Sequence, residues 1–167
     1  MSVTLHTTLG DIKVELYCLD VPRTCENFLA LAASGAYDNT KLHRLIKGFI
    51  VQGGDTTGDG GDSIWNAPFP DEFRSHLKHT KRGVLSMANS GPNTNRSQFF
   101  FTLGKHEHLN NQYTVFGHII AGGDVLDTIE KVPTNAADEP LTDIVIERCT
   151  IHANPIAEAD AAPAAAK

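Results

Sequence analysis

The first part of the chain alternates apolar and polar residues in a way that predicts a β-hairpin. Val3, Leu5 and Thr7 alternate with polar neighbours, and apolar side chains recur at every second position over residues 12–16. Leu9-Gly10-Asp11 lies between the two runs and is typical of a turn. Because every second side chain of a strand points to the same face, each run would bury one face and expose the other.

The period of the pattern changes after Pro22. From Val21 to Ala32 apolar residues fall at i, i+4, i+7, i+8 and i+11, which is the spacing of one helix face. Asp20 or Thr24 is suited to cap the beginning of this helix. Gly35 is suited to end it. We therefore predict a helix over this segment.

Short apolar runs bounded by turn residues predict the remaining strands. They comprise two strands within 42–53, broken near Lys47-Gly48, and strands at 84–88, 98–102, 115–120 and 143–152. A short second helix is expected over about 125–131, whereas residues 53–82 show no period. About eight strands and two helices indicate a mainly β fold, an antiparallel barrel or sandwich with helices covering its ends.

The composition fits a single domain followed by a tail. A chain of 167 residues can close one hydrophobic core, and its apolar runs are too short to span a membrane. From Asn154 onward the residues are mostly Ala, Glu, Asp and Pro, which bury little apolar surface. We assign residues 1–153 to the domain and predict that residues 154–167 form a flexible Ala-rich tail.

Charge and cysteine content exclude several classes of protein. The net charge is −6 and the 14 basic residues form no stripe, which argues against direct binding to nucleic acid. The first residues alternate like a strand and do not resemble a secretory signal. Three cysteines without CxxC spacing, Cys18, Cys25 and Cys149, indicate reduced thiols. We expect a nuclear or cytoplasmic protein that is not secreted.

Three stretches carry the candidate chemistry, namely residues 42–55, 85–101 and 108–117. Strand alternation places Ile50 and Gln52 on the same face of one predicted strand. It likewise places Gln98 and Phe100 on the same face of another. The two phenylalanines that flank Phe100 would then fill the interior. An outer wall that is both apolar and able to form hydrogen bonds is typical of a shallow groove for an extended peptide.

These stretches resemble the signature blocks of the cyclophilins, the peptidyl-prolyl cis-trans isomerases. The blocks include His43-Arg44, Phe49 and Gln52-Gly53-Gly54-Asp55, and the resemblance extends from about Val3 to Ile151. It implies a closed eight-stranded antiparallel barrel capped by two α-helices. Both ends of the domain and a histidine at position 108 resemble a narrower, spliceosome-associated group, which implies spliceosomal proteins as partners.

The resemblance also implies a role for individual residues. Arg44 corresponds to the catalytic arginine of the family. The walls of the proline pocket correspond to Phe49, Ile50, Phe100 and Leu109. Contacts to the substrate backbone correspond to Gln52, Ala88, Asn89 and Gln98, and the pocket rim to His108 and Tyr113. The implied substrates are proline-containing peptides or proteins, bound by a monomer without a metal or cofactor.

These residue types suit the chemistry of prolyl isomerisation. Amide resonance opposes rotation of an X–Pro bond with a barrier of about 18–20 kcal/mol. At the twisted transition state the proline nitrogen regains a lone pair, and a guanidinium donor aimed at it stabilises that state selectively. Arginine stays charged and holds its donors in a rigid plane.

Two other functions remain open from the residues alone. The domain could be a proline-peptide binding module, docked on a splicing assembly, whose turnover is incidental. Eight histidines also raise the hypothesis of a metal-dependent hydrolase. However, the pairs His76/His79 and His106/His108 lack HExxH spacing and a third ligand. The loop 55–60 partly resembles a calcium loop, but position 12 is Asn66 instead of glutamate.

Three positions depart from the family pattern. His108 stands where typical members carry tryptophan, so binding of cyclosporin should be weakened. Ile50 replaces the usual methionine and is stiffer. Arg96 stands where glycine is usual, so it would be strained if that turn required a positive φ.

Overall fold

The computed structural model describes residues 1–152, and the tail predicted for residues 154–167 lies outside the described residues. The strands are β1 (Ser2–Thr7), β2 (Gly10–Leu16), β3 (Thr40–Lys41), β4 (Arg44–Ile46), β5 (Ile50–Gly53), β6 (Val84–Met87), β7 (Phe99–Thr102), β8 (Val115–Ala121) and β9 (Val145–His152). The helices are α1 (Pro22–Ala33), α2 (Gly123–Glu130) and a single 3₁₀ turn, η1 (Glu107–Leu109). Within this part of the chain no helix has the length and apolar character needed to cross a bilayer.

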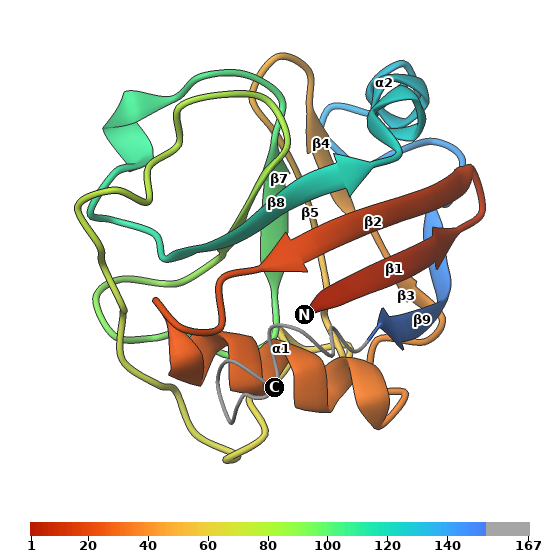
Figure 1. Cartoon of the computed structure of the whole chain (residues 1–167). Coiled ribbons are helices and arrows are strands. Elements are labelled where there is room, and N and C mark those ends of the chain that lie inside the picture. The colour runs from red at the N-terminus through yellow and green to blue at the C-terminus, as the bar shows by residue number, and fades with distance from the viewer. Residues whose placement is uncertain (153–167) are drawn as a thin grey trace.

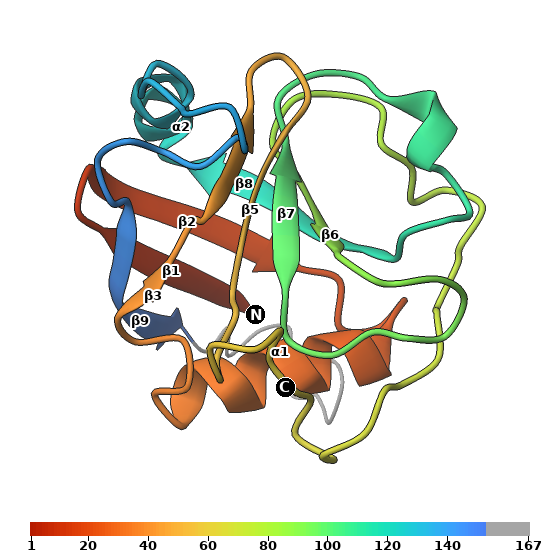
Figure 2. The same ribbon diagram turned by 180° about the vertical axis from the view of Figure 1, so that it is seen from behind.

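All nine strands pair antiparallel in one curled sheet, in the order β3-β9-β1-β2-β8-β6-β7-β5-β4 (Figures 1 and 2). Its two outer strands, β3 and β4, are separated in sequence only by Leu42 and His43, so the chain itself links the two edges. The predicted mainly β barrel with two helices is confirmed. The ninth strand is β3, whose two residues are too few to show a period.

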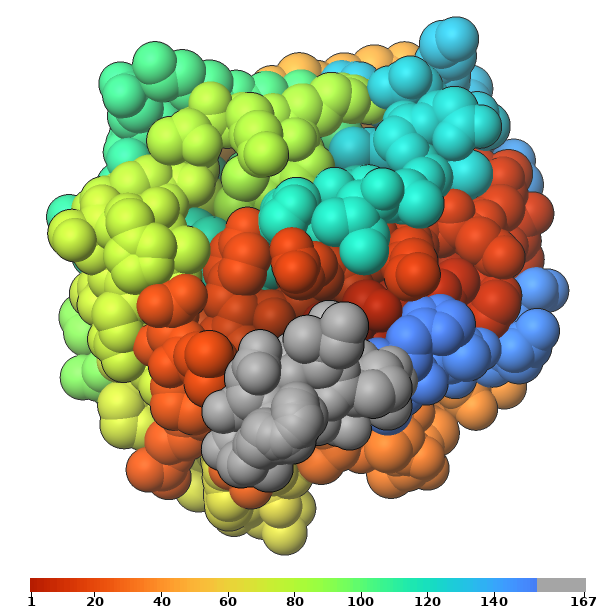
Figure 3. Space-filling model, in the orientation of Figure 1, coloured from red at the N-terminus to blue at the C-terminus, as the bar shows by residue number. Residues whose placement is uncertain are grey.

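Helix α1 lies across one end of the curled sheet, and α2 lies at the opposite end (Figures 1 and 2). Strands from the two ends of the sequence are neighbours, because β1 pairs with β9 from Ser2↔His152 to Thr7↔Ile146. In the space-filling view, the red N-terminal strands accordingly contact the blue segment that ends the described chain (Figure 3).

The interior of the barrel is filled by aromatic and aliphatic side chains from the sheet and the helices. Phe28 of α1 lies edge-on to Phe99 of β7, with ring centroids 5.4 Å apart. Phe99 and Phe101 are both 0% exposed, and Val51 of β5 belongs to the same cluster. The helix predicted for this segment is confirmed, and its apolar face covers this core.

The predicted N-cap of α1 is wrong, whereas Gly35 ends the helix as predicted, since it follows the C-cap residue Ser34 and has a φ of +80°. Val21 is the N-cap residue, and no side chain of the first turn caps the helix. Instead, a carboxylate oxygen of Glu72 accepts hydrogen bonds from the Thr24 main-chain N–H at 2.7 Å and from its hydroxyl at 2.6 Å. An acidic group favours the positive end of a helix in the same way as a local cap.

Candidate active site

The outer face of strands β4, β5 and β7 carries a row of chemically different side chains. Register pairs Arg44 with Gln52, and Gln52 with Phe100. Side chains at paired positions of neighbouring antiparallel strands lie side by side on the same face. A cation, an amide and an aromatic ring are therefore adjacent outside the barrel.

A chain of hydrogen bonds orients the cation in this row. The Gln98 Nε2 group donates to the carbonyl oxygen of Gly60 at 3.0 Å, which leaves the Gln98 Oε1 as an acceptor. Gln52 Nε2 donates to that oxygen at 2.7 Å, and the Gln52 Oε1 in turn accepts from Arg44 Nη1 at 3.2 Å. Because a carbonyl oxygen begins the chain, each amide has one orientation, and the guanidinium is held at the end.

An apolar pocket of about 190 Å³ lies beside the guanidinium. Ile50, Phe100 and Leu109 form a buried cluster of their own, separate from the barrel interior. Tyr113 closes one side with its ring edge-on to Phe100 at 5.5 Å. The residues around the pocket are Arg44, Phe49, Ile50, Gln52, Ala88, Asn89, Phe100, Leu109 and Tyr113.

The rim of this pocket is aromatic. His108 stacks on Phe49 with centroids 5.7 Å apart and an interplanar angle of 21°, while His106 lies edge-on to the same ring at 5.0 Å. Leu109, the last residue of η1, is buried and lines the pocket. His108 thus packs outside Phe49 and lengthens the apolar wall.

A buried histidine supports the floor of the pocket. His79 is 0% exposed and stacks beneath Phe100 at 6.0 Å. Asn110 Oδ1 accepts hydrogen bonds from the His79 main-chain N–H at 2.8 Å and from Nδ1 at 2.9 Å, and the Ser86 hydroxyl lies 3.0 Å from Nε2. Burial lowers the pKa of His79 despite the hydrogen bond to Asn110, so the ring is neutral.

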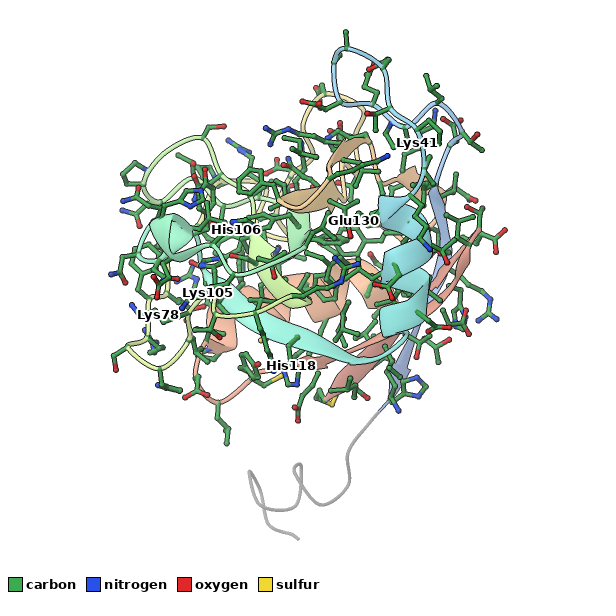
Figure 4. The ribbon with its side chains drawn as sticks, turned by 90° about the horizontal axis from the view of Figure 1, so that it is seen from above. Lys41, Lys78, Lys105, His106, His118 and Glu130 are labelled. Carbon is green, nitrogen blue, oxygen red and sulfur yellow. The ribbon has the colours of Figure 1, made fainter. Side chains whose placement is uncertain are left out.

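The turn between β4 and β5 is held from two sides. The N–H of Gly48 donates to Glu130 Oε2 of α2 at 2.7 Å, and His106 Nε2 donates to the Gly48 carbonyl oxygen at 2.8 Å. Arg82 binds the other oxygen of Glu130 at 2.6 Å. Figure 4 shows Glu130 and His106 coming from different parts of the chain. Since Gly48 precedes Phe49, these contacts determine where the pocket wall begins.

A second hollow, of about 170 Å³, continues the pocket on its polar side. The two hollows share Gln52, Ala88 and Asn89. Arg96 borders the second hollow and pairs with Asp62 at 2.6 Å. The possible strain at Arg96 is absent, because this residue does not have a positive φ.

The structure places the residues selected from the sequence along one groove. Nine of them line the apolar pocket, Gln98 lines the second hollow, and His108 packs against Phe49. Sequence reasoning missed His79 and Glu130, whose partners Asn110 and Gly48 are distant in sequence. No local pattern marks the first, which lies between the polar residues Lys78 and Thr80. None exists for the second.

The histidine pairs do not form a metal centre with other ligands. Within residues 1–152 no three His, Cys, Asp or Glu side chains are grouped so that they could hold a metal ion. His79 uses both ring nitrogens on Asn110 and Ser86. The His106 Nε2 is bound to a main-chain carbonyl.

Comparison with known proteins decides the family. The sequence model described as cyclophilin type peptidyl-prolyl cis-trans isomerase matches residues 2–151. The chain belongs to the cyclophilin family. This cyclophilin is therefore a peptidyl-prolyl cis-trans isomerase by family, consistent with a groove that combines an oriented cation and an apolar pocket.

Similar proteins match this cyclophilin over nearly their whole length. Peptidyl-prolyl cis-trans isomerase-like 3 of Dictyostelium discoideum is 65% identical, over 94% of this chain and 99% of the relative. The human protein of the same name is 58% identical, over 95% of this chain and 100% of the relative. A crystal structure of a Cryptosporidium parvum cyclophilin in the presence of the dipeptide Ala-Pro has a TM-score of 0.88. It is 47% identical and covers 92% of this chain and 100% of its own.

Proposed function

We propose that this cyclophilin acts on X–Pro bonds in extended peptide segments and that Arg44 is its catalytic residue. The observation that supports this assignment is the position of the guanidinium. It borders an apolar pocket, and two glutamine side chains hold it at the end of an oriented hydrogen-bond chain. A cation oriented before substrate arrives needs little reorganisation during the reaction.

The reaction requires selective stabilisation of a twisted amide. Rotation opposes a resonance barrier of about 18–20 kcal/mol. When the amide twists, the proline nitrogen loses conjugation and becomes a hydrogen-bond acceptor. An N–H of Arg44 directed at this nitrogen binds the twisted state more strongly than the planar one, and only such a difference accelerates a step.

The apolar part of the groove would hold the proline ring, and its polar part would contact the peptide main chain. Ile50, Phe100 and Leu109 would hold the proline ring, and their low polarity disfavours the more dipolar planar amide. The Asn89 side chain is engaged with the Gln112 carbonyl oxygen at 2.9 Å, so its main chain is the part that would meet a peptide. Lowering the barrier by about 6 kcal/mol in total would raise the rate about 10⁴-fold.

Replacement of Arg44 tests the assignment. We expect Arg44→Ala to lower kcat/KM for an Ala-Pro peptide by about 10²–10³-fold, the usual cost of losing one transition-state donor. Peptide affinity should change little, since the apolar pocket remains. NMR exchange spectroscopy measures cis–trans exchange, and chemical-shift titration measures binding on the same samples.

Arg148→Ala is the matched control, because Arg148 is also an exposed arginine on a strand, in β9 on another part of the sheet. It should leave exchange unchanged. Exchange in Arg44→Ala equal to that in the wild type would remove Arg44 from the mechanism. Binding without exchange in the wild type would instead support the proline-peptide binding module.

We propose further that spliceosomal proteins with exposed proline segments are among the substrates, and that the protein acts as a monomer in the nucleus or cytoplasm without a cofactor. The support is the resemblance of both ends of the domain to the spliceosome-associated group. Affinity capture from nuclear extract, with identification by mass spectrometry, should enrich splicing proteins. Equal enrichment by a variant with Phe100→Ala would contradict recognition through the groove.

Weak binding of cyclosporin is part of the same proposal. The imidazole of His108 covers less of the groove beside Phe49 than an indole would. His108→Trp should therefore tighten cyclosporin binding, measured by isothermal titration calorimetry. Unchanged affinity would show that position 108 does not limit the ligand.

A further inference from the structure

Two cysteines lie together away from the substrate groove. Cys18 is in the segment between β2 and α1, and Cys25 is in the first half of α1. Both border a shallow, largely apolar hollow of about 590 Å³ at the end of the barrel that α1 covers. Leu29, Ala30 and Ile151 belong to the same hollow.

The two sulfur atoms have different surroundings. Cys18 is only half-buried, so small reagents can reach it from the hollow. Cys25 is 1% exposed, and its Sγ lies 3.7 Å from the Phe116 carbonyl oxygen. The pair thus consists of one accessible thiol and one sheltered thiol beside it.

The two thiols also differ in acidity. Interaction with the neighbouring Cys25 side chain lowers the pKa of Cys18 to about 7, against the opposing effect of burial. About half of Cys18 is then thiolate at pH 7, compared with a few per cent for an ordinary cysteine. The same interaction, together with burial, raises the pKa of Cys25, which stays protonated.

We propose that Cys18 is a peroxide-reactive thiol and that Cys25 resolves its oxidised form as an intramolecular disulfide. An accessible thiolate beside a second cysteine is the arrangement that redox-sensing sites use. This site is independent of the isomerase assignment, since neither cysteine borders the substrate groove.

The reaction balances with hydrogen peroxide as the oxidant. The Cys18 thiolate attacks one peroxide oxygen, the O–O bond breaks, and Cys18 becomes a sulfenic acid while hydroxide leaves. Cys25 then loses its proton, its sulfur attacks the Cys18 sulfur, and the S–O bond breaks with release of hydroxide. The two hydroxides take up two protons, so two thiols and one peroxide yield one disulfide and two waters.

Cys149 provides a control within the same chain. It is half-buried like Cys18. Burial, with a smaller effect of Asp38, raises the pKa of Cys149 to about 12, so its thiolate is scarce at neutral pH. Exposure alone would make Cys18 and Cys149 similarly reactive. The proposed site predicts that Cys18 reacts much faster.

The first test uses the wild-type chain and needs no substitution. Alkylation by iodoacetamide, followed by peptide mass spectrometry, should modify Cys18 at least tenfold faster than Cys149 at pH 7, with a rate that rises through a midpoint near pH 7. Equal rates for the two cysteines would overturn the reactive assignment.

The second test follows oxidation. After brief treatment with hydrogen peroxide, the wild type should lose the mass of two hydrogen atoms and give a peptide cross-linked between Cys18 and Cys25. Cys25→Ser should instead accumulate a Cys18 sulfenic acid that dimedone traps, and Cys18→Ser should form neither product. Cys149→Ser should behave like the wild type.

Two results would contradict the resolving role of Cys25. One is a Cys18 sulfenic or sulfinic acid in the wild type without a cross-link. The other is a cross-link that includes Cys149. If Cys25→Ser fails to fold, the wild-type peptide map still decides between these products. Because no step measures isomerisation, failure here would leave the assignment of Arg44 untouched.

Discussion

Two apolar clusters share strand β7 but lie on opposite faces of the sheet. Phe99 and Phe101 are 0% exposed inside the barrel, and Phe100 between them is 2% exposed in the pocket. The interior cluster is surrounded by protein on all sides, whereas the pocket cluster has three buried members and opens into a cavity. Burial alone therefore does not distinguish a core residue from a binding residue. The face of the strand does.

The largest effect is expected from Phe99→Ala. The change leaves a cavity inside the barrel next to Phe28, and such changes cost about 3–5 kcal/mol of the free energy of unfolding. Urea denaturation followed by circular dichroism measures this loss. Molecules that remain folded at low temperature should isomerise normally, and a greater loss of activity than of folded protein would contradict the separation of the two clusters.

Phe100→Ala should lower activity more than it lowers the free energy of unfolding. The pocket loses one wall, and the apolar contact removed from a proline ring is worth about 1.5–3 kcal/mol, so kcat/KM should fall by one to two orders of magnitude. The free energy of unfolding should fall less than in Phe99→Ala, because water can enter the open pocket. Comparable destabilisation by the two variants would show that the pocket is part of the core.

Local sequence patterns predict which face of β7 each side chain occupies, but they do not predict the long-range contacts that hold the elements in place. Alternation over residues 98–101 is enough to assign Phe100 to the outer face, and helical spacing is enough to locate α1. The cap from Glu72 and the contact between His79 and Asn110 join residues that lie far apart in sequence. No periodicity encodes such contacts. The role of Arg44 came from the resemblance of its whole block, since a single arginine on a strand is usually a surface residue.

The buried His79 makes the stability of the folded protein depend on pH. Burial lowers its pKa, so the folded protein keeps the ring neutral while the unfolded chain binds a proton below its ordinary value of about 6.5. The contribution of a neutral His79 is complete above that value and is lost as pH falls below it, by at most about 1.4 kcal/mol per pH unit. Urea midpoints at pH 7.5 and 5.5 measure the loss.

Variants at two histidines of one loop isolate this effect. His79→Gln should reduce the difference between the two urea midpoints. His76→Gln should not, because the His76 side chain is 61% exposed and pairs with Asp20 at the surface. An unchanged pH dependence in His79→Gln would assign the acid sensitivity to other groups.

The smallest effect concerns a support of the pocket that lies outside both clusters. Glu130→Ala removes the acceptor of the Gly48 N–H and frees the turn before Phe49, at a cost of about 1 kcal/mol, or a fivefold rise in KM with kcat nearly constant. Glu130→Gln keeps an acceptor oxygen and should restore most of the affinity. Asp127→Ala is the matched control, because Asp127 of α2 also binds Arg82 but does not reach Gly48. If both alanine variants raise KM equally, the pocket is stabilised by the ion pairs of Arg82. The hydrogen bond to Gly48 would then have no role of its own. A rise confined to Glu130→Ala, with a shifted Gly48 amide signal in NMR spectra, would show that the apolar pocket depends on a hydrogen bond made at its outer edge.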